Sequence, residues 1–186
     1  LREKLVMSLE MHLGERCSPF KTKNIKPFIH LKSPIINEQE LISLKESEID
    51  SKTISSLFDI EEGTKGFEKK LDEICLLSEM AIHNGCSLII ISDKGVNSKK
   101  SFIPPLLAVG AIHHYLLKKE IRLKASLVIE TGQCWSTHHL ACLIGYGVSA
   151  VCPWLIFESG RHWLKHPKTQ KLIESKKIDS LSKDKV

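Results

Sequence analysis

Apolar residues along this chain follow two spacings in turn, and the alternation predicts the order of its helices and strands. Between residues 103 and 157, apolar positions at helical spacing give way to a short apolar run, and both patterns then repeat. The short runs, residues 125–129 and 149–152, are followed by Glu130 and Pro153, as expected for buried strands that end in a turn. Helices that alternate with buried strands are typical of a parallel α/β fold, because parallel strands need crossover connections.

Four strand–helix units are predicted over the whole chain. The strands lie near residues 53–59, 87–92, 125–130 and 149–152. The helices follow them at residues 67–83, from Pro104 onward, and at residues 137–144 and 155–164. Four such units are half of an eightfold barrel, and a closed barrel needs about 250 residues, so this chain cannot close one alone. The predicted fold class is α/β, with parallel βα repeats that resemble a partial, half TIM-type barrel or form a small open sheet.

Two neighbouring apolar strands are predicted to form the centre of the core. The five residues expected to be buried there are Leu88, Ile89, Ile90, Val128 and Ile129. Helices on the sheet should cover these strands, and the covering side chains are expected to be Leu107, Ile112 and Leu143. Each buried side chain of this size is worth about 1.5–3 kcal/mol relative to exposure.

The N-terminal part of the chain does not follow the strand–helix rhythm. Residues 1–11 have helical spacing, which predicts a helix that ends near Gly14. Residues 15–34 hold three prolines and scattered apolar side chains, which is typical of an irregular arm that runs extended over a surface. Because the helical pattern is already present at Leu1, we expect the sequence to be part of a longer protein.

A capping box follows this arm. Asn37 stands three residues before Glu40, the spacing at which the two side chains can cap a helix start, so a short helix is predicted over residues 38–45. The chain is therefore expected to have three parts. They are an N-terminal helix and extended arm (residues 1–52), a parallel βα core (residues 53–164) and a lysine-rich C-terminal tail (residues 165–186).

Composition limits the classes of function. Hydrophobic residues make up 42% of the chain and charged residues 26%, which is typical of a globular protein rather than a disordered one. Seven lysines in residues 165–185 carry much of the net charge of +5. Because no aromatic residues are interleaved with these lysines, we interpret them as a solvated end and expect no nucleic-acid partner. No apolar run reaches the ~18 residues that a membrane helix needs, so no membrane partner is expected either.

Six cysteines are spread through the sequence without the close spacing of a metal or cluster site. No pair has the CxxC spacing, and none has the clustered spacing of an iron–sulfur site. Four of them lie inside apolar runs, and we expect these to be buried, reduced thiols of a cytosolic protein. These four are Cys75, Cys86, Cys142 and Cys152.

Polar residues follow the predicted strands, at the edge where parallel α/β folds build their sites. Asp93 and Glu130 follow two neighbouring strands, and Thr131 comes next in the chain. One interpretation is a pair of carboxylates for acid–base catalysis. The other is that these carboxylates cap the turns that follow or bind a loop lysine such as Lys94.

Adjacent histidines suggest a metal site only weakly. His113-His114 and His138-His139 are neighbours on helices, where zinc ligands on one face need a spacing of three or four. Each pair therefore offers one ligand to a shared site, and the alternative is one packed and one exposed histidine. Cys134 or Ser136 beside His138 would be a nucleophile, but the GxSxG elbow is absent from the sequence.

Long stretches of the sequence resemble the central domain of glutamate synthase. They are ISDKGV at residues 91–96, IPPLLAVGAIHHYL at 103–116, REKLVMSLEMHLG at 2–14 and, above all, ETGQCWSTHHLACLIGYGVSAVCPWLIFE at 130–158. The segment QCWSTHHLACLIGYG is more similar to the ferredoxin-dependent glutamate synthases of cyanobacteria and plastids than to the pyridine-nucleotide-dependent enzymes. The resemblance extends over the chain to about Trp163.

The resemblance implies a parent oxidoreductase that makes two glutamates from glutamine and 2-oxoglutarate. In that family an amidotransferase domain releases ammonia, and a domain with FMN and a 3Fe-4S cluster reduces the imine with electrons from ferredoxin. The central domain links the two and helps to form the ammonia tunnel, in the cytoplasm or, in a photosynthetic eukaryote, the plastid stroma. No catalytic, cofactor-binding or metal-binding residue of the family falls on a position of this chain, and the chain alone is expected to be inactive.

An autonomous function is the competing hypothesis. In that case the chain would be a small α/β enzyme or a metal-binding protein, with a site at the carboxyl ends of its strands. Asp93, Glu130 and either His138 or His139 would then form the site. Metal analysis separates the two hypotheses, because a metal-dependent site of this kind predicts stoichiometric zinc.

Overall fold

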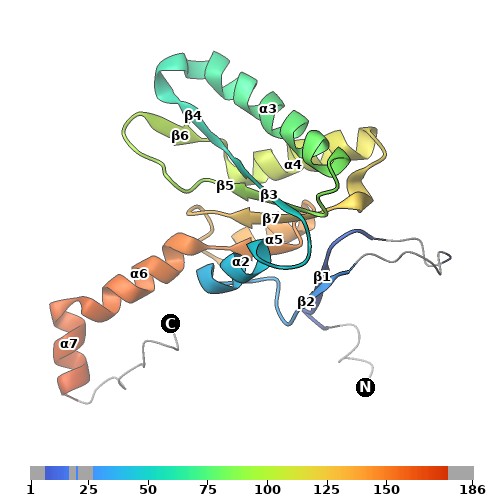
Figure 1. The fold of residues 1–186 in the computed structure, drawn as a ribbon. Helices are drawn as coiled ribbons and strands as arrows, with labels where there is room; N and C mark the ends of the chain where they lie inside the picture. The colour runs from blue at the N-terminus through green and yellow to red at the C-terminus, as the bar shows by residue number, and fades with distance from the viewer. Residues whose placement is uncertain (1–6, 17–19, 21–26, 176–186) are drawn as a thin grey trace.

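A four-stranded parallel sheet is the centre of the molecule. The computed structural model describes residues 7–16, 20 and 27–175. The sheet consists of β3 (Ser51–Ser55), β5 (Leu88–Ser92), β7 (Ser126–Glu130) and β8 (Ala150–Cys152), in that order and all parallel. Neighbours in the sheet are thus neighbours along the chain, as in one half of a βα barrel (Figure 1).

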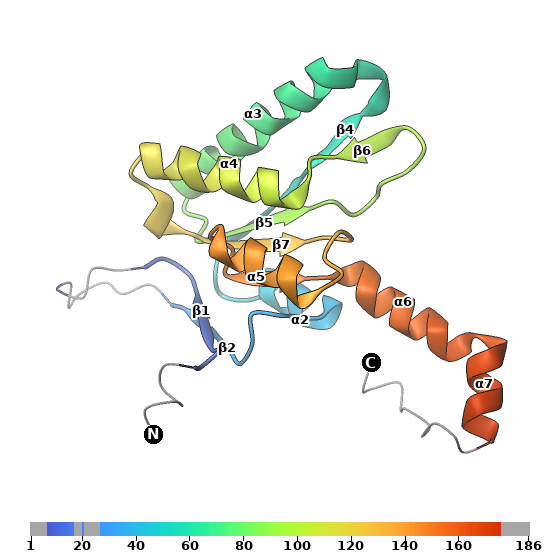
Figure 2. The same cartoon turned by 180° about the vertical axis from the view of Figure 1, so that it is seen from behind.

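Helices connect the strands, as the sequence predicts. α3 (Gly63–His83) lies between β3 and β5, α4 (Pro105–Lys118) between β5 and β7, and α5 (Thr137–Gly145) between β7 and β8. α3 and α4 pack side by side on one side of the sheet (Figures 1 and 2). The predicted fold class, an α/β fold of parallel βα repeats resembling a partial barrel, is confirmed.

Both faces of the sheet are buried at β5, β7 and β8, which explains the apolar runs of these strands, whereas the edge strand β3 is polar and partly exposed. Successive side chains of a strand point to opposite faces, so β5 and β7 each serve two cores. The first core contains Ile89 and Ile129 with residues of α3, α4 and α5. The second contains Leu88, Ile90 and Val128. All five residues predicted to be buried are at most 2% exposed.

One of the three predicted covering residues was wrong. Ile112 and Leu143 are buried against the first core, but Leu107 is 43% exposed. The buried face of α4 contains Ala108, Val109, Ile112 and Leu116. Leu107 is offset from Ala108 by about 100° around the helix axis, which turns it toward solvent.

The second core is covered by the N-terminal part of the chain. α2 (Glu38–Lys45) contributes Leu41 and Leu44. Its start has the predicted capping box, in which the Asn37 side chain accepts from the backbone of Glu40 and the Glu40 carboxylate accepts from the backbone N–H of Asn37.

The predicted N-terminal helix is contradicted where the structure describes it. Residues 7–10 are not helical, and residues 1–6 lie outside the described part of the chain. β1 (Met11–Leu13), in the segment predicted to be helical, pairs in an antiparallel ladder with β2 (Ile29–Leu31), which lies in the arm that we expected to be irregular. Leu13 is fully buried in the second core, and this packing outweighs the helical spacing of the local sequence.

A second antiparallel ladder was also missed. The strand predicted at residues 53–59 is interrupted at Ser56 and continues as β4 (Leu57–Asp59). β4 pairs with β6 (Lys100–Phe102), which is not among the four strands predicted from the sequence. The 3-10 turns η1 (Ile60–Glu62) and η2 (Arg122–Lys124) lead into α3 and β7.

The C-terminal helices project from the sheet. α6 (Trp154–Lys165) begins at the end of β8 and leads away from the body, and α7 (Pro167–Glu174) turns off its outer end (Figures 1 and 2). The Arg161 guanidinium donates to both Glu38 carboxylate oxygens, at 3.0 and 2.8 Å, and ties α6 to α2. Among the described residues, no helix has both the length and the apolar composition needed to cross a membrane.

Candidate functional site

Asp93 is held by three donors from two other parts of the chain. It follows β5 and is only 4% exposed. The Thr131 hydroxyl donates to it at 2.6 Å, and the backbone N–H of Gly132 donates at 3.0 Å. The indole N–H of Trp154, at the start of α6, donates at 2.9 Å. These groups stabilise the carboxylate inside the protein and tie together the ends of β5, β7 and β8.

Glu130 has its own partners on the next strand. The Ser92 hydroxyl donates to Oε2 at 2.6 Å, and the Lys94 ammonium lies 3.8 Å from Oε1. Lys94 also lies 5.8 Å from the ring centroid of Trp154, so one lysine contacts both the carboxylate and the indole. The predicted alternative, in which a carboxylate at this edge binds Lys94, is confirmed for Glu130.

The two strand-end carboxylates have little free space beside them. A general acid or base must come within hydrogen-bond distance of a substrate proton. The hollow beside Asp93 and Glu130 is too small to hold a water molecule. Asp93 caps the turn after β7, and Glu130 binds Lys94, so the structure brings both candidates to one edge and satisfies each of them internally.

The first histidine pair belongs to a structural cluster. The Nε–H of Arg122 donates to His113 Nδ1 at 3.0 Å, and the other guanidinium nitrogens donate to the carbonyls of Ala125 and Gly147. Burial, the Arg122 charge and His114 lower the pKa of His113, and burial also lowers that of Arg122. The His113 and His114 rings are nearly perpendicular with centroids 5.4 Å apart, and Nδ1 of His113 is already engaged by Arg122.

The second histidine pair lies at the start of α5. The Ser136 side chain caps this helix by accepting from the backbone N–H of His139. His139 Nδ1 accepts from the backbone N–H of Trp135. His138 Nε2 lies 3.5 Å from the sulfur of Cys142, one helical turn away. His138 therefore contacts Cys142 rather than either predicted nucleophile, Cys134 or Ser136.

Three of the five cysteines that the structure describes are buried thiols. Burial raises the pKa of Cys75 and of Cys134 to about 11 and that of Cys152 to about 12. Cys86 and Cys142 are half-buried, so the prediction that they are buried was wrong. Cys86 follows the C-terminus of α3, and Cys142 is one turn from the exposed His138 on α5. Cys17 lies outside the described residues.

The described cysteines do not converge as the ligands of a cluster. Iron–sulfur clusters need converging thiolates, whereas the three cysteines with raised pKa values are buried apart from one another, in α3, in the loop after β7 and in β8. At the start of α5, where free backbone N–H groups could meet a phosphate, those of Trp135 and His139 already donate within the chain. Within residues 7–16, 20 and 27–175, no three His, Cys, Asp or Glu side chains could hold a metal ion together.

Trp154 is the residue of this site that sequence reasoning missed. Its indole bonds a carboxylate 61 positions earlier in the chain. The sequence offers one signal for this residue, which is that Trp154 comes at the start of a helix directly after a strand and so at this edge of the sheet. The ring also packs close to Gly132, where an added Cβ would lie 3.1 Å from it, so a small residue is needed there.

The fold and the strand-end geometry define a parallel βα domain whose polar edge is internally bonded. Comparison with known proteins gives its family. Residues 1–184 match the profile described as the glutamate synthase central domain, and the chain belongs to this family.

Similar proteins carry the name of the whole enzyme. The chain is 46% identical over 185 residues to ferredoxin-dependent glutamate synthase of Pyropia yezoensis, with 96% of this chain covered. It is 44% identical over 186 residues to ferredoxin-dependent glutamate synthase 2 of Synechocystis, with 97% covered, and 41% identical over 188 residues to the chloroplastic enzyme of Oryza sativa, with 98% covered. The chain spans about 12% of the length of each relative.

Proposed function

We propose that this chain is the central connecting domain of a longer ferredoxin-dependent glutamate synthase. The parent enzyme would form two glutamates from glutamine and 2-oxoglutarate and so assimilate ammonia. The domain would link an amidotransferase domain to an FMN-binding domain and help to form the ammonia tunnel between them. The family match and the names of the relatives support this function, and so does the small share of their length that the chain spans.

The bonding of the strand-end carboxylates is the observation that carries the proposal. Asp93 accepts from Thr131, Gly132 and Trp154, and Glu130 binds Ser92 and Lys94. A polar edge of this kind stabilises a domain and fixes the direction of the helix that follows. It supports a connecting role over the competing hypothesis of an autonomous enzyme or metal protein with its site at this edge.

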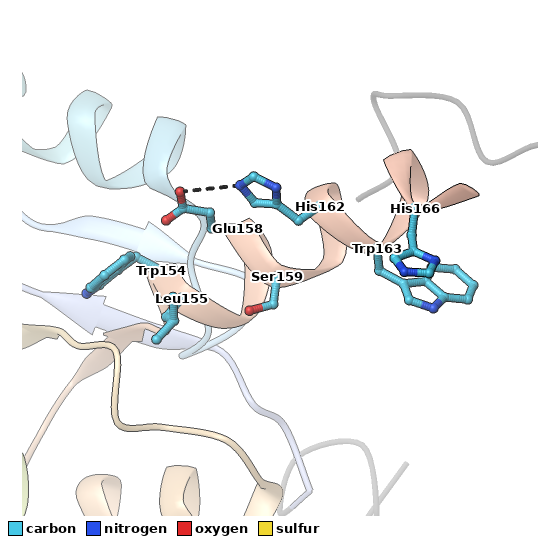
Figure 3. A pocket seen from close by; sticks show the side chains of 7 residues that line it. All are labelled: Trp154, Leu155, Glu158, Ser159, His162, Trp163 and His166. Carbon is cyan, nitrogen blue, oxygen red and sulfur yellow. Dashed lines mark ion pairs between the residues drawn. The ribbon is translucent and has the colours of Figure 1, made fainter. Parts of the chain in front are cut away.

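The surface of α6 supports contact with another part of a longer polypeptide. None of its residues is buried, and its apolar side chains include Trp163, which is 49% exposed. A hollow of about 630 Å³ runs along the helix between Trp154 and His166 (Figure 3). Glu158 and His162 lie 3.9 Å apart on the rim of this hollow. We propose that a neighbouring domain of the same chain covers this face, because exposed apolar patches commonly mark interaction sites.

The cofactors and the electron donor belong to other parts of the parent in this proposal. FMN and the 3Fe-4S cluster would be bound by the later domain, and ferredoxin would deliver electrons there. The described cysteines of this chain do not converge as the ligands of a cluster would. The enzyme would act in the cytoplasm, or in the plastid stroma of a photosynthetic eukaryote, as the chloroplastic relatives suggest.

The division of the chain remains part of the proposal. Residues 53–164 would be the βα core of the domain, residues 1–52 its N-terminal cover and residues 165–186 a lysine-rich tail. The burial of Leu13 and Leu41 against the sheet supports treating the N-terminal part as one unit with the core.

A substitution on α6 in the full-length enzyme tests the connecting role. Trp163→Glu would place a charge in the proposed contact, and loss of a central aromatic contact costs roughly 2 kcal/mol or more. Glutamate formation from glutamine should fall about tenfold or more. Formation from added ammonia should be retained, because ammonia bypasses transfer between domains. The control Met80→Glu, on the outer face of α3, should leave both rates unchanged.

Equal loss of both rates would mean that Trp163 stabilises the enzyme and has no specific part in ammonia transfer between domains. No loss of either rate would contradict the proposed contact. Metal analysis of the 186-residue chain tests the competing hypothesis separately, and one zinc per chain would favour it.

A further inference from the structure

We propose that Cys142 and His138 form a thiol-exchange site that takes up low-molecular-mass disulfides. This inference is independent of the proposed connecting function. The two residues lie one helical turn apart on α5, and their sulfur and Nε2 atoms are 3.5 Å apart. Residues four apart lie on the same face of a helix, so the contact follows from the spacing in the sequence.

The surroundings of the cysteines select Cys142. A thiol reacts as its thiolate and needs both access and a group that accepts its proton. Cys75, Cys134 and Cys152 are buried. Cys86 is half-buried, but no hydrogen bond from a described residue reaches its sulfur. Cys142 combines partial exposure with a neighbouring imidazole whose side chain is exposed.

A groove beside the pair provides room for the group that would become attached. Its volume is about 530 Å³, within the range of small-molecule sites. Phe102, Pro104, Leu106 and Leu143 give it apolar walls, and Gln133 and His139 give it polar groups. This lining fits a thiol-containing peptide of a few residues that carries both apolar and polar groups.

The exchange needs no oxidant other than the disulfide itself. His138 Nε2 accepts the proton of the Cys142 thiol, and the thiolate attacks one sulfur of the disulfide. A new S–S bond forms as the old one breaks. The leaving thiolate takes the proton from the imidazolium. The sulfur of Cys142 is oxidised, the departing sulfur is reduced, and one free thiol is released for each mixed disulfide formed.

Peptide mapping of the full 186-residue chain after incubation with oxidised glutathione tests the site. Cys142 should carry the adduct at least about tenfold faster than Cys86. His138→Gln should slow the reaction at Cys142 by about the same factor. His162→Gln, a substitution of an exposed histidine on α6, is the matched control and should leave the rate unchanged. Circular dichroism should confirm that each variant is folded.

The pH dependence of the rate separates proton transfer from a structural effect. His138, His139 and Cys142 are the titratable groups among the described residues that line the groove. Between pH 6 and 8, the rate at Cys142 should rise less steeply in the native chain than in His138→Gln, because the imidazole supplies the base. Equal rates at Cys86 and Cys142, or parallel profiles for native chain and His138→Gln, would overturn the proposal.

Discussion

At the scale of single residues, Asp93 determines how the polar edge of the sheet is organised. Every group that contacts its carboxylate in the described structure is a donor: a hydroxyl, a backbone N–H and an indole N–H. An amide in the same place would turn its own NH₂ group toward the indole N–H of Trp154, or toward the Thr131 hydroxyl, which would then have to accept instead of donate. The carboxylate accepts at both oxygen atoms without such a change.

Asp93→Asn should lower the free energy of unfolding by about 1–3 kcal/mol, the cost of a buried polar group left unsatisfied. Urea unfolding of the variant and the native chain measures this difference in free energy. Asp72→Asn, on the exposed side of α3, is the matched control and should change stability by less than about 0.5 kcal/mol. If Asp93→Asn were as stable as the native chain, the structural role assigned to this carboxylate would be wrong.

Gly147 is restricted both by its backbone and by its neighbour. Its φ of +108° lies in a region that residues with a side chain rarely adopt. A Cβ there would lie 2.3 Å from His113 Nδ1, the atom that accepts from Arg122. Any side chain at this position would displace the imidazole from the guanidinium.

Gly147→Ala should destabilise the chain by about 1–3 kcal/mol, through strain at positive φ and the lost contact. Gly145→Ala is a matched control, because a Cβ at Gly145 meets no atom within 4 Å. That substitution near the end of α5 should be neutral or stabilise by up to about 1 kcal/mol. Thermal unfolding of both variants would show it, and equal midpoints would contradict the crowding at Gly147.

His113 should make stability depend on pH in the acid range. Its lowered pKa means that the unfolded chain binds a proton more readily than the folded chain does. Burial disfavours the charged imidazolium in the fold, and so do the Arg122 and His114 charges. Stability is therefore full above the ordinary histidine pKa of about 6.5 and is lost as pH falls through the lower folded value.

His113→Gln keeps an acceptor near Arg122 but removes the titration. Unfolding in urea between pH 7 and 5 should show a smaller loss of stability for this variant than for the native chain. Parallel curves would mean that His113 does not contribute to the acid sensitivity.

At the scale of elements, the sheet depends on strands that are buried on both faces. Ile90 is fully buried in the second core, between the sheet and the N-terminal part of the chain. Ile90→Ala should lower the free energy of unfolding by about 2–5 kcal/mol. Ile42→Ala, at a 44% exposed position of α2, is the matched control and should change stability by less than about 0.5 kcal/mol. Similar urea midpoints for the two variants would contradict the two-core arrangement.

The elements that the sequence predicted well are those with a strong local pattern. β5, β7 and β8 are continuous apolar runs, and α2 begins with a capping box, so each is specified by neighbouring letters. β1, β2, β4 and β6 have three residues each and form their ladders with segments distant in sequence. No periodicity exists over three residues, so these ladders could not be predicted.

The contacts of the candidate site also differ in how far the sequence could predict them. The contact of Glu130 with Lys94 was expected because both residues border strands that should be neighbours. The bond from Trp154 to Asp93 depends on where α6 begins in space, which the letters between them do not specify. His138 and Cys142 have the helical spacing of a contact, but the sequence analysis considered each only within another hypothesis.

At the scale of the whole molecule, the chain has the architecture of half a barrel with its second face already covered. The N-terminal strands and α2 occupy that face, and the polar edge is bonded internally. Such a domain can be stable without a cofactor and present α6 to a neighbour. We therefore propose that this chain connects other domains and holds no redox group of its own.

Flavin retention by the purified 186-residue chain tests that claim most directly. The chain is mixed with excess FMN and desalted, and the visible spectrum and flavin fluorescence are recorded. Because the strand-end carboxylates are bonded within the chain, no flavin absorbance should remain with the protein. One retained FMN per chain would contradict the connecting role and would move a binding site to the strand ends around Asp93, Glu130 and Thr131.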